Sequence, residues 1–214
     1  MILDSLVVGP IQANCYLLGC PETREALVID PGDEPERIAK CLARHGLRPV
    51  AYFHTHGHID HVGGTAGLKA RFGGRILLHR ADLFLYQNAR EHALDFGIQV
   101  PATLPVDHFV DDGEEIAWGQ VKGRVMHTPG HSPGGICLRV PENEGPGRVI
   151  TGDTLFAGGI GRTDLPGGSM SQLLRSIRER LLTLPDATVV ASGHGPLSTI
   201  GEERHTNPFL QEGW

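Results

Sequence analysis

The amino-acid sequence predicts an α+β fold, a four-layer αββα sandwich made of two similar halves. Short apolar runs bounded by Gly and Pro recur in both halves of the 214-residue chain. Helical patterns follow them, in the order strands, helix, strand, helices and then strands, helix, strand. No linker separates the halves, and two sheets with helices outside would bury their apolar faces against each other. We therefore expect residues 1–214 to form a single domain.

The first half is expected to alternate between strands and helices. Apolar runs between turn residues place strands at residues 2–8, 14–18, 26–29, 50–53 and 76–78. Helices are expected at residues 33–45, 61–72 and 80–93. In the first of these helices, Ile38, Ala39 and Leu42 share one face, and Gly46 is its stop signal.

The second half is expected to contain strands at residues 116–118, 121–126, 135–140, 148–150 and, as the final strand, 188–191. The best helical pattern of the chain covers residues 169–184, with Ser169 as N-cap. Its apolar residues follow helical spacing: Leu173, Leu174, Ile177, Leu181 and Leu182. A hairpin loop is expected at residues 141–147, whereas residues 95–108 give weak signals.

Composition and charge argue against several classes of protein. The net charge of −6 is opposite to that of most nucleic-acid binders, so no nucleic-acid partner is expected. No apolar run approaches the ~20 residues of a membrane span, and the N-terminus lacks the pattern of a signal peptide. These features predict a cytoplasmic protein with no membrane partner. The four cysteines form neither a CxxC pair nor a disulfide framework.

The strongest chemical signal is the segment Thr55-His56-Gly57-His58-Ile59-Asp60-His61. It follows one predicted strand, precedes a predicted helix, and presents three imidazoles and a carboxylate at the turn between them. Neutral imidazole and carboxylate are common ligands of zinc and iron. The alternative is a chance cluster of surface histidines, but imidazoles this dense would repel one another on protonation. The segment therefore predicts a metal site.

Three residues in the second half lie in comparable places. His131, Asp153 and His194 each follow a predicted strand within a Gly-containing turn, where strands that point at one edge bring side chains together. Residues 130–134 also fit the GxSxG pattern of serine hydrolases. However, Pro133 follows that serine and has no N–H for an oxyanion hole, so serine catalysis is disfavoured.

These motifs resemble those of the metallo-β-lactamase superfamily, in which the THxHxDH segment precedes a histidine in a GHSPG-like turn, a Gly-Asp pair and a final Gly-His pair. The resemblance covers nearly the whole chain. Within the superfamily, the chain is similar to the glyoxalase II group, the hydroxyacylglutathione hydrolases. Residues 158–164, 193–199 and 207–210 resemble the short bacterial branch that lacks a C-terminal helical domain. The family fold implied by this resemblance is the same αββα sandwich.

The resemblance implies two divalent metal ions per chain, with zinc favoured and iron or manganese also suited to the ligands. It implies seven ligands: His56, His58 and His131 for the first ion, Asp60, His61 and His194 for the second, and Asp153 as a bridge. Asp60 is also the candidate catalytic residue, because its carboxylate would orient a metal-bridging hydroxide that attacks a carbonyl. His54 and His127 receive no ligand role and are expected to be structural.

The activity that the resemblance implies is hydrolysis of S-lactoylglutathione or a similar small-molecule thioester. Its thiolate leaves without a general acid, because a thiol has a low pKa. This sequence ends soon after His194, so without the helical domain a weak grip on glutathione is expected. Arg162 is the candidate contact for a substrate carboxylate. The alternative is an ion pair with Asp164 that fixes the loop.

Other functions compete with this interpretation. A persulfide dioxygenase, in which related ligands hold one iron, shares the motifs, but the ending Gly193-His194-Gly195-Pro196 favours the hydrolase. A β-lactamase is expected to carry a signal peptide, and a nuclease of the superfamily needs a basic surface. A non-catalytic metal-binding module is disfavoured because closed structural zinc sites favour Cys-rich ligand sets.

Overall fold

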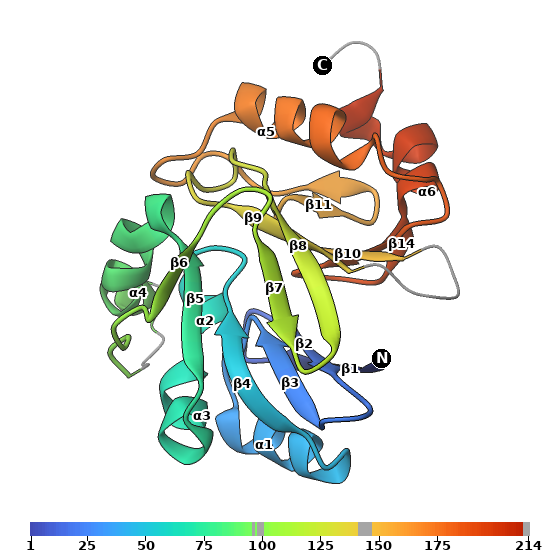
Figure 1. Cartoon of the computed structure of the whole chain (residues 1–214). Coiled ribbons are helices and arrows are strands. Elements are labelled where there is room, and N and C mark those ends of the chain that lie inside the picture. The colour runs from blue at the N-terminus through green and yellow to red at the C-terminus, as the bar shows by residue number, and fades with distance from the viewer. Residues whose placement is uncertain (96, 98–100, 141–146, 212–214) are drawn as a thin grey trace. The chain divides into compact units, whose positions relative to one another are not determined.

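The computed structural model describes residues 1–95, 97, 101–140 and 147–211. The chain forms two compact units, each built around one six-stranded sheet (Figure 1). We call them the N-terminal unit, Met1–Val110 with Ala117–Lys122, and the C-terminal unit, Asp111–Ile116 with Gly123–Trp214. The hairpin loop predicted at residues 141–147 lies, except for Gly147, outside the described residues.

The sheet of the N-terminal unit has the strand order β1-β2-β3-β4-β5-β6. The pairs β1–β2 and β2–β3 are antiparallel, whereas β3 to β6 run parallel, so the sheet is mixed. The strands are β1 (Ile2–Val8), β2 (Ala13–Gly19), β3 (Glu25–Ile29), β4 (Arg48–Phe53), β5 (Arg75–His79) and β6 (His108–Val110). Five of them match predicted strands, whereas β6 was not predicted and begins at the last residue of the segment that gave weak signals, His108.

The helices of this unit are α1 (Pro35–Arg44), α2 (Ile59–Val62), α3 (Thr65–Phe72) and α4 (Leu83–Asp95). α1 and α3 lie beside β4 and share an apolar core with the sheet (Figure 1). The single helix predicted at 61–72 is wrong, because it is interrupted between α2 and α3 at Gly63 and Gly64. There the N–H of Gly64 bonds the carbonyl of Pro31 at 2.8 Å.

The sheet of the C-terminal unit has the order β14-β13-β10-β9-β8-β7. β10 and β13 run parallel, while β8, β9 and β10 pair antiparallel. Its strands are β7 (Glu115–Trp118), β8 (Val121–His127), β9 (Ile136–Val140), β10 (Arg148–Gly152), β13 (Val189–Ser192) and β14 (Ser198–Thr199). β11 (Leu155–Phe156) and β12 (Gly159–Ile160) form a separate small hairpin.

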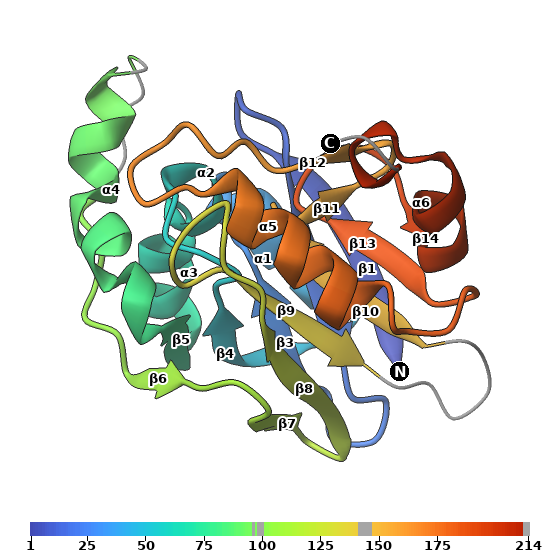
Figure 2. The same ribbon diagram turned by 90° about the horizontal axis from the view of Figure 1, so that it is seen from above.

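Helix α5 (Met170–Ser176) lies across the second sheet (Figure 2) and continues into a π-helical turn, Ile177–Leu181. Ser169 is its N-cap, as predicted, and accepts a hydrogen bond from the N–H of Gln172. The strand predicted at 188–191 is present as β13, but it is not the final element as predicted, because β14 and α6 (Ile200–Thr206) follow it. β11, β12 and β14 are only two residues long, which is too short for a periodic pattern to reveal.

The two mixed sheets, each flanked by helices, make this an α+β fold, as predicted. Among the residues that the structure describes, no helix is both long and apolar enough to cross a membrane.

Candidate metal centre

The THxHxDH segment forms the turn from β4 into α2 in the N-terminal unit. The ring centroid of His56 lies 4.8 Å from that of His58 and 4.1 Å from that of His61. His61 Nε2 lies 3.4 Å from Asp60 Oδ2. His56 and His61 are buried, whereas His58 and Asp60 are partly exposed. The predicted ligands of this unit therefore converge on one place.

The turn is bonded to Asp82, directly before α4, and packs against the first turn of that helix. Asp82 is fully buried, and its Oδ2 accepts a hydrogen bond from the N–H of Gly57 at 2.9 Å. A side chain at position 57 would place its Cβ 2.7 Å from the backbone nitrogen of Tyr86. Only glycine permits this close approach, so the packing of α4 determines the path of the backbone between His56 and His58.

His54 supports the segment without joining the cluster of ligands. Burial lowers the pKa of its imidazole to about 4, so the ring is neutral at physiological pH. Its Nδ1 donates to the carbonyl of His61 at 3.2 Å, and its Nε2 accepts from the hydroxyl of Thr65 at 3.2 Å. These contacts give His54 the structural role that the sequence indicated.

Asp30 is the functional residue of this unit that sequence reasoning missed. It follows β3, is 1% exposed, and has a left-handed backbone with φ 49°. Its Oδ2 accepts hydrogen bonds from the hydroxyl of Thr55 at 2.6 Å and from His61 Nδ1 at 3.0 Å, and its Oδ1 accepts from the N–H of Thr55 at 2.8 Å. The signal that was available is the Asp-Pro-Gly run directly after an apolar strand.

This arrangement fixes the tautomers of two imidazoles. The carboxylate of Asp30 only accepts, so Nδ1 of His61 carries the proton. The Thr55 hydroxyl gives its own proton to Asp30, and its oxygen, 3.0 Å from His56 Nδ1, therefore accepts from that nitrogen. In both neutral rings the lone pair is then on Nε2, and that nitrogen is available to a metal ion.

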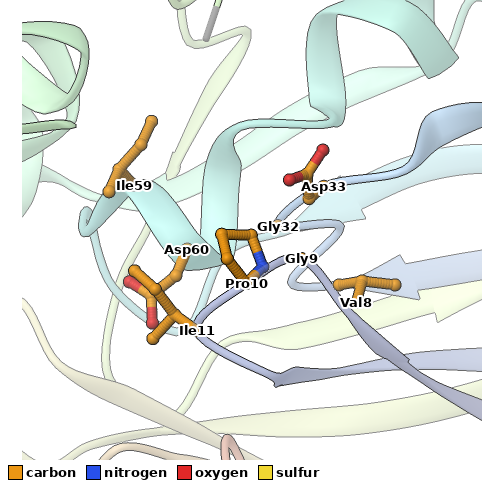
Figure 3. Close-up of a pocket in the computed structure, with 8 residues that line it drawn as sticks. All are labelled: Val8, Gly9, Pro10, Ile11, Gly32, Asp33, Ile59 and Asp60. Atoms are coloured by element: carbon orange, nitrogen blue, oxygen red, sulfur yellow. The ribbon is translucent and has the colours of Figure 1, made fainter. Parts of the chain in front are cut away.

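A small crevice adjoins Asp60 in the same unit (Figure 3). Residues of the β1–β2 turn, the β3–α1 loop and α2 line it, most of them apolar residues or glycines with two carboxylates beside them: Val8, Gly9, Pro10, Ile11, Gly32, Asp33, Ile59 and Asp60. Gly32 is packed so tightly that a Cβ there would lie 1.6 Å from the carbonyl oxygen of Asp60. The backbone carbonyl of Asp60 therefore packs directly against Gly32, with no room for a side chain at that position.

In the C-terminal unit, the imidazoles of His131 and His194 both approach one carboxylate oxygen of Asp153. Asp153 Oδ2 lies 3.7 Å from His131 Nε2 and 3.6 Å from His194 Nε2. Backbone and hydroxyl contacts join the turns that carry them. The N–H of Gly193 bonds the carbonyl of Gly152 at 2.7 Å, and the hydroxyls of Thr128 and Thr154 lie 3.1 Å apart.

The loop after β12 orients His131 through its main chain. His131 Nδ1 donates to the carbonyl oxygen of Arg162 at 2.7 Å, so in the neutral ring Nε2 bears the lone pair. A Cβ at Gly161 would lie 1.9 Å from the carbonyl oxygen of Asp153. In each unit, therefore, the carbonyl of one predicted carboxylate ligand, Asp60 or Asp153, packs closely against a glycine.

The side chain of Arg162 forms the ion pair that the sequence left open as an alternative. Its Nε and Nη2 donate to the two carboxylate oxygens of Asp164 at 2.8 and 2.7 Å, and this contact lowers the pKa of Asp164 to about 2. Both side chains are more than half exposed. His127 likewise has a structural contact, since its Nε2 donates to the carbonyl of Pro133 at 3.0 Å.

The donor atoms of both units fit divalent metal ions. His61 Nε2 faces a carboxylate oxygen of Asp60, and His131 Nε2 faces one of Asp153. In the neutral rings these are pairs of acceptors, which repel each other until a cation lies between them. Imidazole and carboxylate are ligands that zinc, iron and manganese share, and the described residues of both clusters include no thiol.

Comparison with known proteins decides the family. The model of the metallo-β-lactamase superfamily matches residues 8–194. The chain belongs to the metallo-β-lactamase superfamily. The predicted metallo-β-lactamase fold, with two mixed sheets flanked by helices, is confirmed. In its broad class the protein is a metal-dependent hydrolase of this superfamily.

Similar proteins place it more closely within the superfamily. Hydroxyacylglutathione hydrolase GloC of Haemophilus influenzae is 39% identical, over 98% of this chain and 98% of that protein. The crystal structure of TTHA1623 in a di-iron-bound form is 41% identical, with a TM-score of 0.88, over 97% of this chain and all of that one. The BLEG-1 B3 metallo-β-lactamase is 37% identical, with a TM-score of 0.90, over 98% and 99% of the two chains. The protein is thus close to the short hydroxyacylglutathione hydrolase branch of the metallo-β-lactamase superfamily.

Proposed function

We propose that this protein is a dinuclear metal-dependent thioesterase that cleaves S-lactoylglutathione or a similar thioester. The observation that carries the proposal is the paired geometry of imidazole and carboxylate at His61–Asp60 and His131–Asp153. Similarity to a hydroxyacylglutathione hydrolase over nearly the whole chain supports the choice of substrate class.

The proposed centre holds two divalent ions. The first ion would be held by His56, His58 and His131, the second by Asp60, His61 and His194, with Asp153 as the bridge. Zinc and iron both fit such ligands, and a similar protein has been crystallised in a di-iron-bound form. The metal ions, when bound, would supply hydroxide at neutral pH and polarise the carbonyl of the thioester.

The residues of this chain would position the reactants. The carboxylate of Asp60 would accept a hydrogen bond from the attacking nucleophile and aim it at the carbonyl carbon. Asp30 would keep the Nε2 lone pairs of His56 and His61 available. Val8, Ile11 and Ile59 would limit the access of water to Asp60 from the side of the crevice. The leaving thiolate requires no acid from the protein.

Purified protein loaded with zinc or iron is expected to contain two ions per chain and to hydrolyse S-lactoylglutathione. Elemental analysis and release of the free thiol measure the two properties, and removal of the metal with a chelator should abolish turnover. The same sample should consume no oxygen with glutathione persulfide and should leave a β-lactam intact. One iron per chain with oxygen uptake would replace the proposal with a dioxygenase, and β-lactam cleavage without thioester cleavage would replace it with a β-lactamase.

Asp60→Asn is expected to reduce kcat by at least about 100-fold, the contribution typical of a group that assists proton transfer. The first metal should stay bound, because its ligands His56, His58 and His131 are unchanged. Metal content and kcat measured on the same preparation separate the two effects. Loss of both metals without an intermediate state would show that Asp60 has a different role.

A further inference from the structure

A second group of candidate metal ligands lies between β1 and α1. Asp4 on β1, Cys41 on α1 and His45 at the C-cap of α1 offer a carboxylate oxygen, a sulfur and an imidazole nitrogen within 4.8 Å of one another. Asp4 Oδ2 lies 3.1 Å from Cys41 Sγ and 2.7 Å from His45 Nε2. None of these residues belongs to the proposed hydrolytic centre.

Asp4 occupies a place where an apolar residue is expected. Side chains alternate along a strand, and Ile2, Leu6 and Val8, in the same row of β1 as Asp4, pack against the apolar core of the unit. Aspartate is disfavoured in strands, and a partly buried carboxylate needs compensating partners. Its side chain is 26% exposed, and its carboxylate bonds to side chains on α1 and at the end of that helix. This placement points to a role for the carboxylate.

The helix presents complementary ligands. Cys41 and His45 are four positions apart, so they lie on one face at the carboxyl end of α1, where the helix dipole favours a cation. Thiolate, imidazole and carboxylate together suit zinc and softer ions such as cadmium. Tetrahedral zinc would need separations of roughly 3.3–3.6 Å between these atoms. Both distances from Asp4 Oδ2 are shorter than these values, so the carboxylate would move slightly away from the other two groups as an ion enters. Cys41 is buried, whereas His45 and Asp4 open to solvent and give an ion access.

Arg44 is the group that competes with an ion. Its Nη2 lies 2.7 Å from Asp4 Oδ2 and 3.2 Å from Cys41 Sγ. In this position the guanidinium neutralises the carboxylate. The side chain of Arg44 is 68% exposed, so it can turn into solvent when an ion takes its place.

We propose that Asp4, Cys41 and His45 form a separate structural site for a zinc-like, thiophilic divalent cation that fastens the edge strand β1 to α1. When the ion binds, the Cys41 thiol loses its proton to solvent and the sulfur–metal bond forms. The His45 proton moves from Nε2 to Nδ1, and water completes the coordination. This site does not depend on the proposed thioesterase activity.

Cadmium provides a test that the hydrolytic centre cannot imitate, because the ligands proposed there include no sulfur. Tag-free protein, already loaded with its hydrolytic metals, is titrated with cadmium while thiolate-to-metal charge-transfer absorption is recorded in the ultraviolet. One further equivalent should bind and produce the band. The band should be absent in Cys41→Ala and retained in Cys20→Ala, the matched control at another buried thiol. Asp4→Asn and His45→Ala should weaken binding by about tenfold or more.

Arg44→Gln gives an independent readout. Removal of the competing charge should tighten cadmium binding several-fold, whereas a hydrogen-bond network without affinity for ions would not respond. Circular dichroism verifies that each variant folds, and Cys41→Ser replaces Cys41→Ala if the latter does not. The proposal is overturned if the wild-type protein gives no band, if the band survives loss of the Cys41 thiol, or if it disappears with Cys20.

Discussion

Asp30→Asn is expected to weaken metal binding by about 10- to 100-fold, the effect typical of losing a partner that orients a metal ligand. Asparagine has one acceptor oxygen where Asp30 uses two, and its NH₂ group would confront donors. The Thr55 hydroxyl and His61 Nδ1 both donate to Oδ2 of the native carboxylate. His61 would then move its proton to Nε2, and the lone pair offered to a metal would be lost.

Metal titration of the metal-free protein measures this effect directly, and nitrogen NMR of labelled histidine reports the tautomer of His61. Asp107→Asn is the matched control. Asp107 accepts hydrogen bonds from Lys69 and from the N–H of Ile76 in the same unit, but it is not bonded to any of the proposed ligands. Equal losses of affinity in the two variants would show that Asp30 acts on general stability and not on the imidazoles.

Gly32→Ala is expected to displace the backbone of Asp60 and to remove nearly all activity. A Cβ at position 32 would lie 1.6 Å from the carbonyl oxygen of Asp60, and the nearest atoms are backbone, so no side-chain rotation relieves the clash. Gly161→Ala should have the corresponding effect on Asp153, whose carbonyl oxygen would lie 1.9 Å from the new Cβ. Overpacking of this kind costs about 1–3 kcal/mol or more of stability.

Thermal melting, metal content and kcat separate loss of fold from loss of the site. Gly159→Ala, two residues before Gly161, is the matched control, since a Cβ there meets only ordinary contacts with Phe156 at 3.8 Å. If the Gly32→Ala variant bound metal and turned over substrate at the normal rate, the close packing of Gly32 against Asp60 would not matter for function.

The clustering of the candidate ligands within each unit could be anticipated because its signal is local. Imidazoles and a carboxylate within one short segment require no knowledge of distant contacts, and the Gly-containing turns mark the remaining candidates. Asp30 could not be found in this way. Its role depends on a contact with Thr55 and His61, 25 and 31 positions away, and a lone carboxylate after a strand has many ordinary explanations.

Contacts made by main-chain atoms also could not be predicted from the types of the residues. The sequence drew attention to the guanidinium of Arg162, but the contact to His131 comes from its carbonyl, which any residue provides. The shortest strands escaped for a different reason, since two residues carry no periodicity. The break between α2 and α3 was predictable in principle from Gly63-Gly64, where a backbone bond to Pro31 replaces the continuation of the helix.

The hydrogen bonds that orient His56, His61 and His131 all run between protein groups, through Asp30, Thr55 and the carbonyl of Arg162. The rotamer entropy of these three rings is therefore lost when the chain folds, not when an ion arrives. An incoming metal meets preorganised nitrogens and has only to shed its hydration shell. If these rings hold metal ions as proposed, a change from one divalent metal to another is expected to leave their orientation unchanged, because protein groups and not the ion set it.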